Sequence, residues 1–174
     1  MKRIFRPFRL FVYQLHQDDP KKCTAAKLLR LNKVRPIYEP QKIPKDAIVL
    51  DPYSKDVFSP LDRENLHYGV VAIDSSWKKA KDVFKIRFKG VHRRLPLLLP
   101  ANPINYGHVS MLSSAEALAA ALYIADFKEQ AKELLSVFKW GETFFDLNKD
   151  ALDEYSSAKS QSHILEAERD YFGL

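Results

Sequence analysis

The spacing of apolar and polar positions changes along the chain. Over the first hundred residues, short apolar runs alternate with polar segments that suit short helices. We expect five strands, at residues 8–14, 34–38, 47–50, 69–73 and 93–99. The runs 47–50 and 69–73 are apolar throughout and are each followed by an aspartate, a pattern typical of buried parallel strands with polar groups at their carboxyl ends. Pro36 favours a sheet edge for its strand.

Helical periodicity replaces these runs after residue 100. Ser113 and Glu116 form an S-x-x-E capping box at the start of an apolar helix over 115–125. A second helix is expected over 127–140, with Gly141 as its stop signal. Further helices are expected at 25–31, 77–83, 142–148, 150–157 and 162–172. The chain therefore predicts an α/β domain over residues 1–99 and an all-helical domain over residues 100–174.

The composition is that of a globular protein and excludes several classes. Hydrophobic residues make up 46% of the 174 positions, and apolar runs such as 95–101 fall far short of the roughly 20 residues that span a bilayer. We expect no membrane partner, no secretion signal and a cytoplasmic location. The single cysteine, Cys23, excludes an internal disulfide and a four-cysteine iron–sulfur cluster. Neither GxGxxG nor GxxxxGK[ST] occurs, so the usual phosphate-binding loops are absent.

Charge is distributed unevenly between the two halves. Residues 1–114 hold 22 Lys and Arg against 10 Asp and Glu, a net of +12, whereas residues 115–174 hold 6 against 12, a net of −6. A surface rich in lysine and glutamate would explain the amount of charge but not its segregation. The asymmetry therefore favours a polyanion such as a nucleic acid as the partner of the first part.

Two loops can bind an anion or border a ligand, and each also has an ordinary structural explanation. Residues 19–24 place lysines and Thr24 at a helix start, which suits a carboxylate or phosphate; alternatively, Thr24 is a simple N-cap beside solvated lysines. Residues 93–107 are rich in proline and carry Asn102 and Asn105. Such a rigid loop can border a ligand, or it can only order a long connection.

The segment 72–80 has the densest chemistry. Asp74 offers a carboxylate to an amine, and Trp77 offers an aromatic wall to a cation or a base. Alternatively, Asp74 or Ser75 only caps a turn, and Trp77 belongs to the core. The five histidines show no metal-ligand spacing, so no metal site is expected. We expect Cys23 to be a packed thiol.

Four motifs resemble one family, in the family's order: DDPKKCT, AIDSSW, RRLPLLLPANPINYG and LSSAEALAAALYI. The sequence is similar over residues 8–172 to the aminocarboxypropyltransferases of small-subunit ribosomal RNA. The resemblance implies a SPOUT-like, mainly parallel sheet with a deep trefoil knot and a helical C-terminal domain, with S-adenosylmethionine as cofactor. It implies transfer of the 3-amino-3-carboxypropyl group to N3 of a pseudouridine or N1-methylpseudouridine, during ribosome biogenesis.

The resemblance also implies roles for individual residues. Asp74 is the catalytic candidate, as a base for the N3 proton or as a ligand of the cofactor's amino group. The cofactor-binding residues are Thr24, Val49, Leu50, Pro52, Asp74, Trp77, Ala80, Leu112, Ser113 and Ser114. Apart from the resemblance, we expect Lys22, Lys27 and Arg94, followed by Arg93 and Lys21, to bind phosphates of the RNA.

One departure from the family concerns Ser75, which stands where members often have a cysteine, and it argues against a covalent cysteine at that position. The family's N-terminal stretch has been described as metal-binding, which one cysteine does not support. The alternatives are a SPOUT-type rRNA methyltransferase and a non-catalytic rRNA-binding assembly factor. We expect small-subunit rRNA or a pre-ribosomal particle as partner, and a monomer.

Overall fold

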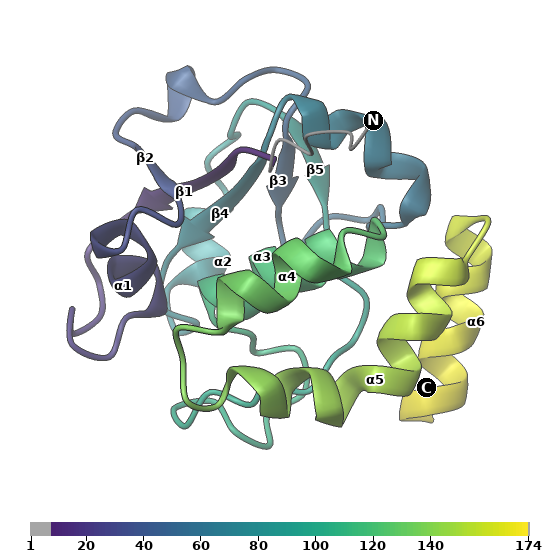
Figure 1. Ribbon diagram of the computed structural model, residues 1–174. Coiled ribbons are helices and arrows are strands. Elements are labelled where there is room, and N and C mark those ends of the chain that lie inside the picture. The colour runs from purple at the N-terminus through teal and green to yellow at the C-terminus, as the bar shows by residue number, and fades with distance from the viewer. Residues whose placement is uncertain (1–7, 174) are drawn as a thin grey trace, which may run out of the picture.

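Five parallel strands form one sheet in the order β2–β1–β4–β3–β5. The computed structural model describes residues 8–173, and its strands are β1 Leu10–Gln14, β2 Arg35–Ile37, β3 Ile48–Leu50, β4 Val70–Asp74 and β5 Val91–Arg93. The central strand β4 pairs with β1 and with β3, so that Val70 faces both Leu10 and Ile48 (Figure 1). Pro36 lies in the edge strand β2, as its missing N–H requires. Four of the five expected strands are confirmed.

The strand expected over 93–99 is wrong beyond Arg93. Residues 95–99 have no regular structure, because Pro96 interrupts any ladder and helical side chains take up the backbone N–H groups instead. Leu97 donates to Glu168 over 3.0 Å, and Leu99 donates to Asn148 over 2.7 Å. Both acceptors lie about 50 residues or more further along the chain, which local periodicity does not reveal.

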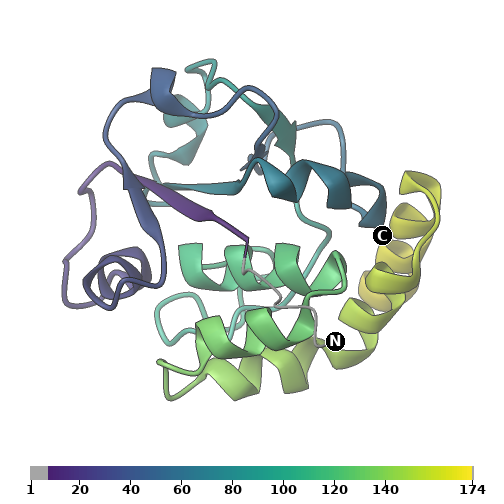
Figure 2. The ribbon, with the colours of Figure 1, turned by 45° about the horizontal axis from the view of Figure 1, so that its top comes forward.

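Six α-helices and two 3₁₀ helices accompany the sheet in residues 8–173. They are α1 Thr24–Arg30, η1 Pro40–Lys42, η2 Pro60–His67, α2 Ala80–Val83, α3 Ser114–Ile124, α4 Lys128–Leu135, α5 Gly141–Ser157 and α6 Gln161–Phe172. The capping box of Ser113 and Glu116 is confirmed at the start of α3. Figure 2 shows α5 and α6 packed side by side at one flank of the molecule.

Two helix predictions need correction. The helix expected over 127–140 ends at Leu135, and the segments 142–148 and 150–157 are one continuous helix, α5. Gly141 begins α5 rather than stopping α4. A Cβ there would lie 2.0 Å from the carbonyl oxygen of Leu135, so glycine is required by close backbone contact at the junction of the two helices.

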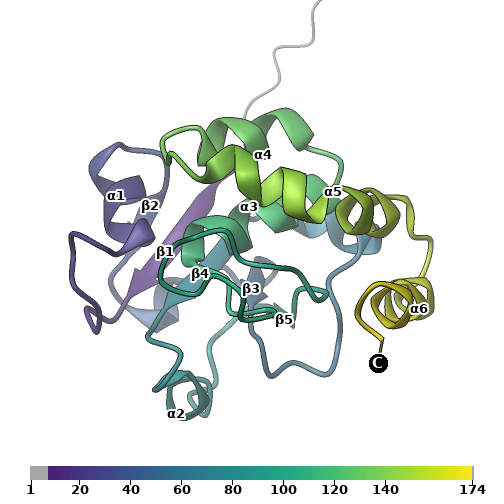
Figure 3. The ribbon, with the colours of Figure 1, turned by 90° about the horizontal axis from the view of Figure 1, so that it is seen from below.

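The side chains of β4 alternate between two cores, one on each face of the sheet. Val70 and Ala72 join the larger core, to which α1, α3, α4, α5 and α6 contribute, whereas Val71 and Ile73 join a smaller core that includes Val83 of α2. Figure 3 shows the sheet between α3 and α4 on one side and α2 on the other. The α/β class with a parallel sheet is therefore confirmed.

The larger core draws side chains from both parts of the chain, including Val12 of β1 and Leu118 of α3. The domain division at residue 99 stays a prediction. None of the helices within residues 8–173 combines the length and the apolar character that crossing a bilayer requires.

Candidate functional site

A cavity of about 780 Å³ lies at the carboxyl ends of β3 and β4. In a parallel sheet these ends meet at one edge, which is where open α/β sheets bind ligands. The remaining walls come from residues 17–24, from 75–80 and Phe84, from the connection 94–113, from the start of α3 and from Trp140. Five separate parts of the sequence therefore enclose a single site.

Asp74, the last residue of β4, holds the centre of a small polar cluster in this cavity. The hydroxyl of Ser114 donates to its Oδ1 over 2.9 Å, and the thiol of Cys23 donates to its Oδ2 over 3.2 Å. Ser114 and Cys23 lie 40 and 51 residues away from Asp74 in sequence. They fix the orientation of the carboxylate and leave it further lone pairs for a ligand.

Cys23, and not Thr24, caps α1. Its sulfur accepts the backbone N–H of Ala26 over 3.4 Å. Burial raises the pKa of the Cys23 thiol to about 11, and the charge of Asp74 adds to that effect. A protonated thiol that caps a helix is a poor nucleophile, which agrees with the expected packed thiol.

Thr24 joins the two helices that start at the cavity. Its hydroxyl oxygen accepts the backbone N–H of Ala115 in α3 over 3.2 Å. The interpretation of Thr24 as the N-cap of its own helix is therefore wrong. Among the contacts of the described residues this hydroxyl only accepts, so its own proton is available to a ligand carboxylate.

An apolar wall faces the polar cluster. The indole N–H of Trp77 donates to the carbonyl of Leu112 over 3.2 Å, which ties the segment after β4 to the connection before α3. The structure brings nine of the ten predicted cofactor residues to this cavity. The exception is Val49, which is fully buried in the smaller core. Because side chains alternate along β3, Leu50 faces the cavity and Val49 faces the opposite side of the sheet.

Glu116 of α3 does more than complete the capping box. Its side chain is fully buried and accepts from Ser113 and also from the loop before it. Oε1 accepts the backbone N–H groups of Ala101 and Asn102 over 2.7 and 3.0 Å, and Oε2 accepts the Asn102 amide over 2.7 Å. The S-x-x-E pattern predicts the cap but not this link, which joins the ANPINYG segment to the start of α3.

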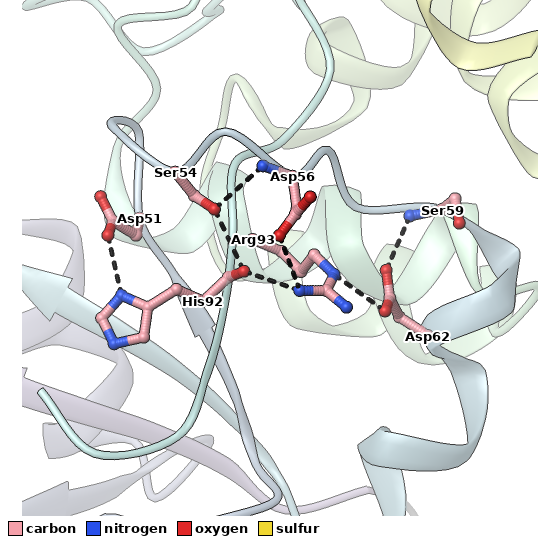
Figure 4. Close-up of polar contacts among 7 residues, drawn as sticks. All are labelled: Asp51, Ser54, Asp56, Ser59, Asp62, His92 and Arg93. Carbon is pink, nitrogen blue, oxygen red and sulfur yellow. Dashed lines mark hydrogen bonds and ion pairs between the residues drawn. The ribbon is translucent and has the colours of Figure 1, made fainter. Parts of the chain in front are cut away.

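Three of the five predicted RNA contacts have other partners. Arg93 binds Asp62 over 3.0 Å (Figure 4), and Arg94 makes two hydrogen bonds with Glu168 over 2.7 and 3.1 Å. Lys27 donates to the carbonyl of Val137 over 2.6 Å. Each of these three side chains therefore has a hydrogen-bond partner within the protein, and each partner is distant in sequence.

The other two lysines remain exposed. Lys21 and Lys22 both lie in the turn before α1, and Lys22 lines the cavity. Their position beside the site suits contact with a polyanion.

His92 and Asp51 form a second polar pair at the rim of this site (Figure 4). Asp51 lines the cavity, and its Oδ2 lies 2.8 Å from the Nδ1 of His92. The Nε2 of His92 lies 2.6 Å from the carbonyl oxygen of Phe88. Since both partners are acceptors, both contacts are hydrogen bonds only when both ring nitrogens carry a proton. The hydrogen bond with Asp51 raises the pKa of His92 above its ordinary 6.5, against the opposing effect of burial.

This pair predicts a pH-dependent stability. Because the pKa of His92 is raised in the folded state, its contribution is complete below 6.5 and is lost as the pH rises through the raised value. We expect the melting-temperature difference between the wild type and His92→Gln to be largest at mildly acid pH and to shrink at alkaline pH. His108→Gln, at an exposed histidine, is the control. A difference that is constant with pH would contradict the prediction.

A parallel sheet with a cavity of this size at its carboxyl edge defines a protein of the α/β class that binds a nucleotide-sized ligand. The family described as "Ribosome biogenesis protein, C-terminal" matches residues 48–172. The chain belongs to this family, and specifically to the branch whose curated members are named 16S rRNA aminocarboxypropyltransferase.

Relatives match over nearly the full chain. The 16S rRNA aminocarboxypropyltransferase of Methanocaldococcus jannaschii is 44% identical, over 94% of this chain and 95% of that protein. The protein of that name from Methanosphaera stadtmanae is 45% identical, over 95% and 98%. The solved SAM-dependent rRNA:acp-transferase Tsr3 from Vulcanisaeta distributa is 42% identical, with a TM-score of 0.87 over 96% of this chain and 90% of that chain.

A second family, described as "Possible Fer4-like domain in RNase L inhibitor, RLI", matches residues 8–42. Cys23 is the only cysteine of the chain, so this segment lacks the thiolates of a four-cysteine cluster. Within residues 8–173, no group of three or more His, Cys, Asp or Glu side chains could hold a metal ion.

Proposed function

We propose that this protein transfers the 3-amino-3-carboxypropyl group of S-adenosylmethionine to N3 of a pseudouridine or N1-methylpseudouridine in small-subunit rRNA. The observation that carries the proposal is the cavity around Asp74, in a chain whose relatives are named for this reaction on 16S rRNA. The description of the matching family supports a role in ribosome biogenesis, with the rRNA or a pre-ribosomal particle as partner.

The chemistry of the cavity fits S-adenosylmethionine. The ligand carries a flat adenine ring with apolar faces, a carboxylate and two cationic groups, and the cavity offers a counterpart to each. Leu50, Pro52 and Leu112 form an apolar surface for adenosine, and Thr24 has a hydroxyl proton to donate to the carboxylate. Asp74 supplies negative charge beside the cationic groups. When bound, S-adenosylmethionine would supply the carboxypropyl group from its sulfonium: the bond between the γ-carbon and sulfur breaks, and neutral 5′-methylthioadenosine leaves.

The protein's own groups determine which carbon is open to attack. Trp77 and Ala80 would shield the methyl group, so that the γ-carbon of the methionine chain faces the RNA. Asp74 would bind the ammonium group or accept the proton that leaves N3. Neither role needs a covalent thiol: Ser75 occupies the motif position, and the protonated Cys23 serves Asp74 as a hydrogen-bond donor. Positioning of this kind can lower the activation free energy of the transfer by several kcal/mol.

Finer features of the family belong to the same proposal. We infer a deep trefoil knot, a C-terminal helical domain from residue 100, a monomeric state and a cytoplasmic location. The knot rests on the resemblance to the family; the irregular connection 94–113 lines the cavity at the strand ends, where a knotted sheet would present its cofactor.

Isotopic labelling tests the reaction. The protein is incubated with small-subunit rRNA that carries the pseudouridine or N1-methylpseudouridine but not the carboxypropyl group, and with S-adenosylmethionine labelled in the carboxypropyl chain or, separately, in the methyl group. We expect only the carboxypropyl label to enter the RNA. Label from the methyl group alone would identify a methyltransferase, and no label from either despite RNA binding would identify an assembly factor without turnover.

Trp77 provides a prediction about cofactor affinity. Trp77→Ala removes the aromatic wall and the hydrogen bond to Leu112. We expect the Kd for S-adenosylmethionine, measured by calorimetry, to rise about 10- to 100-fold, the range expected for a buried aromatic surface. Trp77→Phe keeps most of the wall and should lose less. An unchanged Kd for Trp77→Ala would remove this residue from the binding site.

A further inference from the structure

A second hollow, of about 450 Å³, adjoins the cofactor cavity. The two share part of their walls, so they are continuous at the shared residues. These are Lys22, Cys23, Thr24, Pro103, Ile104 and Trp140. We call the second hollow the side groove. The side groove therefore opens directly into the cavity around Asp74.

The side groove has an aromatic wall. Phe138 and Trp140 stack on each other with ring centroids 4.7 Å apart and planes 23° apart. Both are half-buried and lie in the irregular segment between α4 and α5. Ile104, 61% exposed, adds apolar surface from the ANPINYG segment. The groove therefore presents flat aromatic and apolar surface to solvent, next to a reaction site.

Lys27 holds this wall in place. Its ammonium donates to the carbonyl of Val137 over 2.6 Å and lies 5.0 Å from the centre of the Phe138 ring. A lysine bound in this way fixes the segment that carries the two aromatic side chains. Lys27 is partly buried and lines the groove itself, and these two contacts give the aromatic wall a defined position.

The remaining charge in the groove is positive. Lys21, Lys22 and Arg30 line it and are all exposed. Aromatic faces beside unpaired basic side chains are the combination that binds single-stranded nucleic acid, since bases stack on the rings and phosphates meet the charges. An enzyme that modifies N3 must also take its acceptor base out of the stack, which exposes the neighbouring base.

We propose that the side groove is a nucleobase subsite, in which the nucleotide next to the acceptor stacks on the Phe138–Trp140 wall while Lys21, Lys22 and Arg30 hold its phosphates. The inference rests on the proposed function and extends it from the cofactor to the RNA. It assigns Trp140 and Ile104 to RNA recognition, and it assigns Lys27 to the support of that wall.

The test compares Trp140→Ala with the wild type on two labelled RNAs: a hairpin with pseudouridine in a single-stranded loop, and a loop-free duplex of the same stem. Stacking of one base predicts a Kd for the hairpin about 5- to 100-fold higher, with little change for the duplex. The matched control is Tyr38→Ala, at an exposed aromatic residue outside both hollows, and should change neither. Equal losses on both RNAs, or no loss, would overturn the subsite.

Fluorescence gives a second measurement that does not depend on the folding of Trp140→Ala. The chain has two tryptophans, so Trp77→Phe leaves Trp140 as the only indole. We expect the hairpin to quench the emission of Trp140 and the duplex to leave it unchanged. No quenching at a saturating concentration of hairpin would overturn the proposal.

If Trp140 stacks on RNA but no carboxypropyl label is transferred, the proposed function fails and the subsite stands. If label is transferred without any effect at Trp140, the subsite fails and the function stands.

Discussion

Replacing Asp74 with asparagine should lower the rate of carboxypropyl transfer by about 100-fold or more, the range of general acid–base groups. The substitution keeps the shape of the side chain and removes its charge. Both neighbours can adapt, because the hydroxyl of Ser114 and the thiol of Cys23 can accept as well as donate. The fold should therefore survive, and the loss should report on the charge itself. Single-turnover transfer of the labelled group is the measurement.

The two roles of Asp74 separate in the binding data. A ligand of the ammonium group predicts a higher Kd for S-adenosylmethionine in Asp74→Asn, whereas a base for the N3 proton predicts an unchanged Kd with slow transfer. The control is Asp82→Asn, at an exposed carboxylate on α2 that pairs only with Lys85 in the described structure. Turnover at the wild-type rate in Asp74→Asn would remove both roles.

The parallel sheet could be predicted from sequence because its signals are local. The runs 47–50 and 69–73 are apolar throughout, and this pattern alone indicates strands buried on both faces. The run 93–99 looks similar but depends on distant partners. The side chains of Glu168 and Asn148 accept hydrogen bonds from its backbone N–H groups. The spacing of residues within the segment does not reveal these acceptors in α6 and α5.

The site was predictable in its main residues and unpredictable in how they are joined. Asp74 and Trp77 carry recognisable chemistry at a strand end, and the structure brings both to the cavity. The bond between Cys23 and Asp74 joins residues 51 positions apart, which only the fold creates. A prediction that places both Val49 and Leu50 in the cavity cannot hold, because alternation along a strand allows only one of the two side chains to face it.

Charge counting alone overstated the basic surface. Arg94 belongs to the positive part of the chain and Glu168 to the negative part, and the two neutralise each other across the fold. Arg93 is likewise paired with Asp62. Among the described residues, Lys21, Lys22 and Arg30 are exposed beside the site and have no such ion pair, so they are the basic residues that we expect to meet RNA most readily.

Glu116→Gln should destabilise the protein almost as much as Glu116→Ala. The buried carboxylate accepts five hydrogen bonds, from the N–H groups of Ala101, Asn102 and Ser113, the Asn102 amide and the Ser113 hydroxyl. Alanine leaves these donors without an acceptor, and the glutamine amide places a donor against donors. Since each buried unsatisfied group costs about 1–3 kcal/mol, we expect the free energy of unfolding, from urea titration, to fall by about 3 kcal/mol or more in both variants.

The control for Glu116 is Glu129→Gln, at an exposed position in the first turn of α4, which should change the free energy of unfolding by less than about 0.5 kcal/mol.

The loss of the Glu116 carboxylate should also weaken ligand binding. The carboxylate oxygens of Glu116 hold both the ANPINYG segment and Ser113. Without these hydrogen bonds, the part of the cavity wall that carries Leu112 and Ile104 becomes looser. We therefore expect weaker binding of S-adenosylmethionine even at temperatures where Glu116→Gln stays folded. A variant of full stability would show that proline rigidity alone orders this connection and that the buried carboxylate has another purpose.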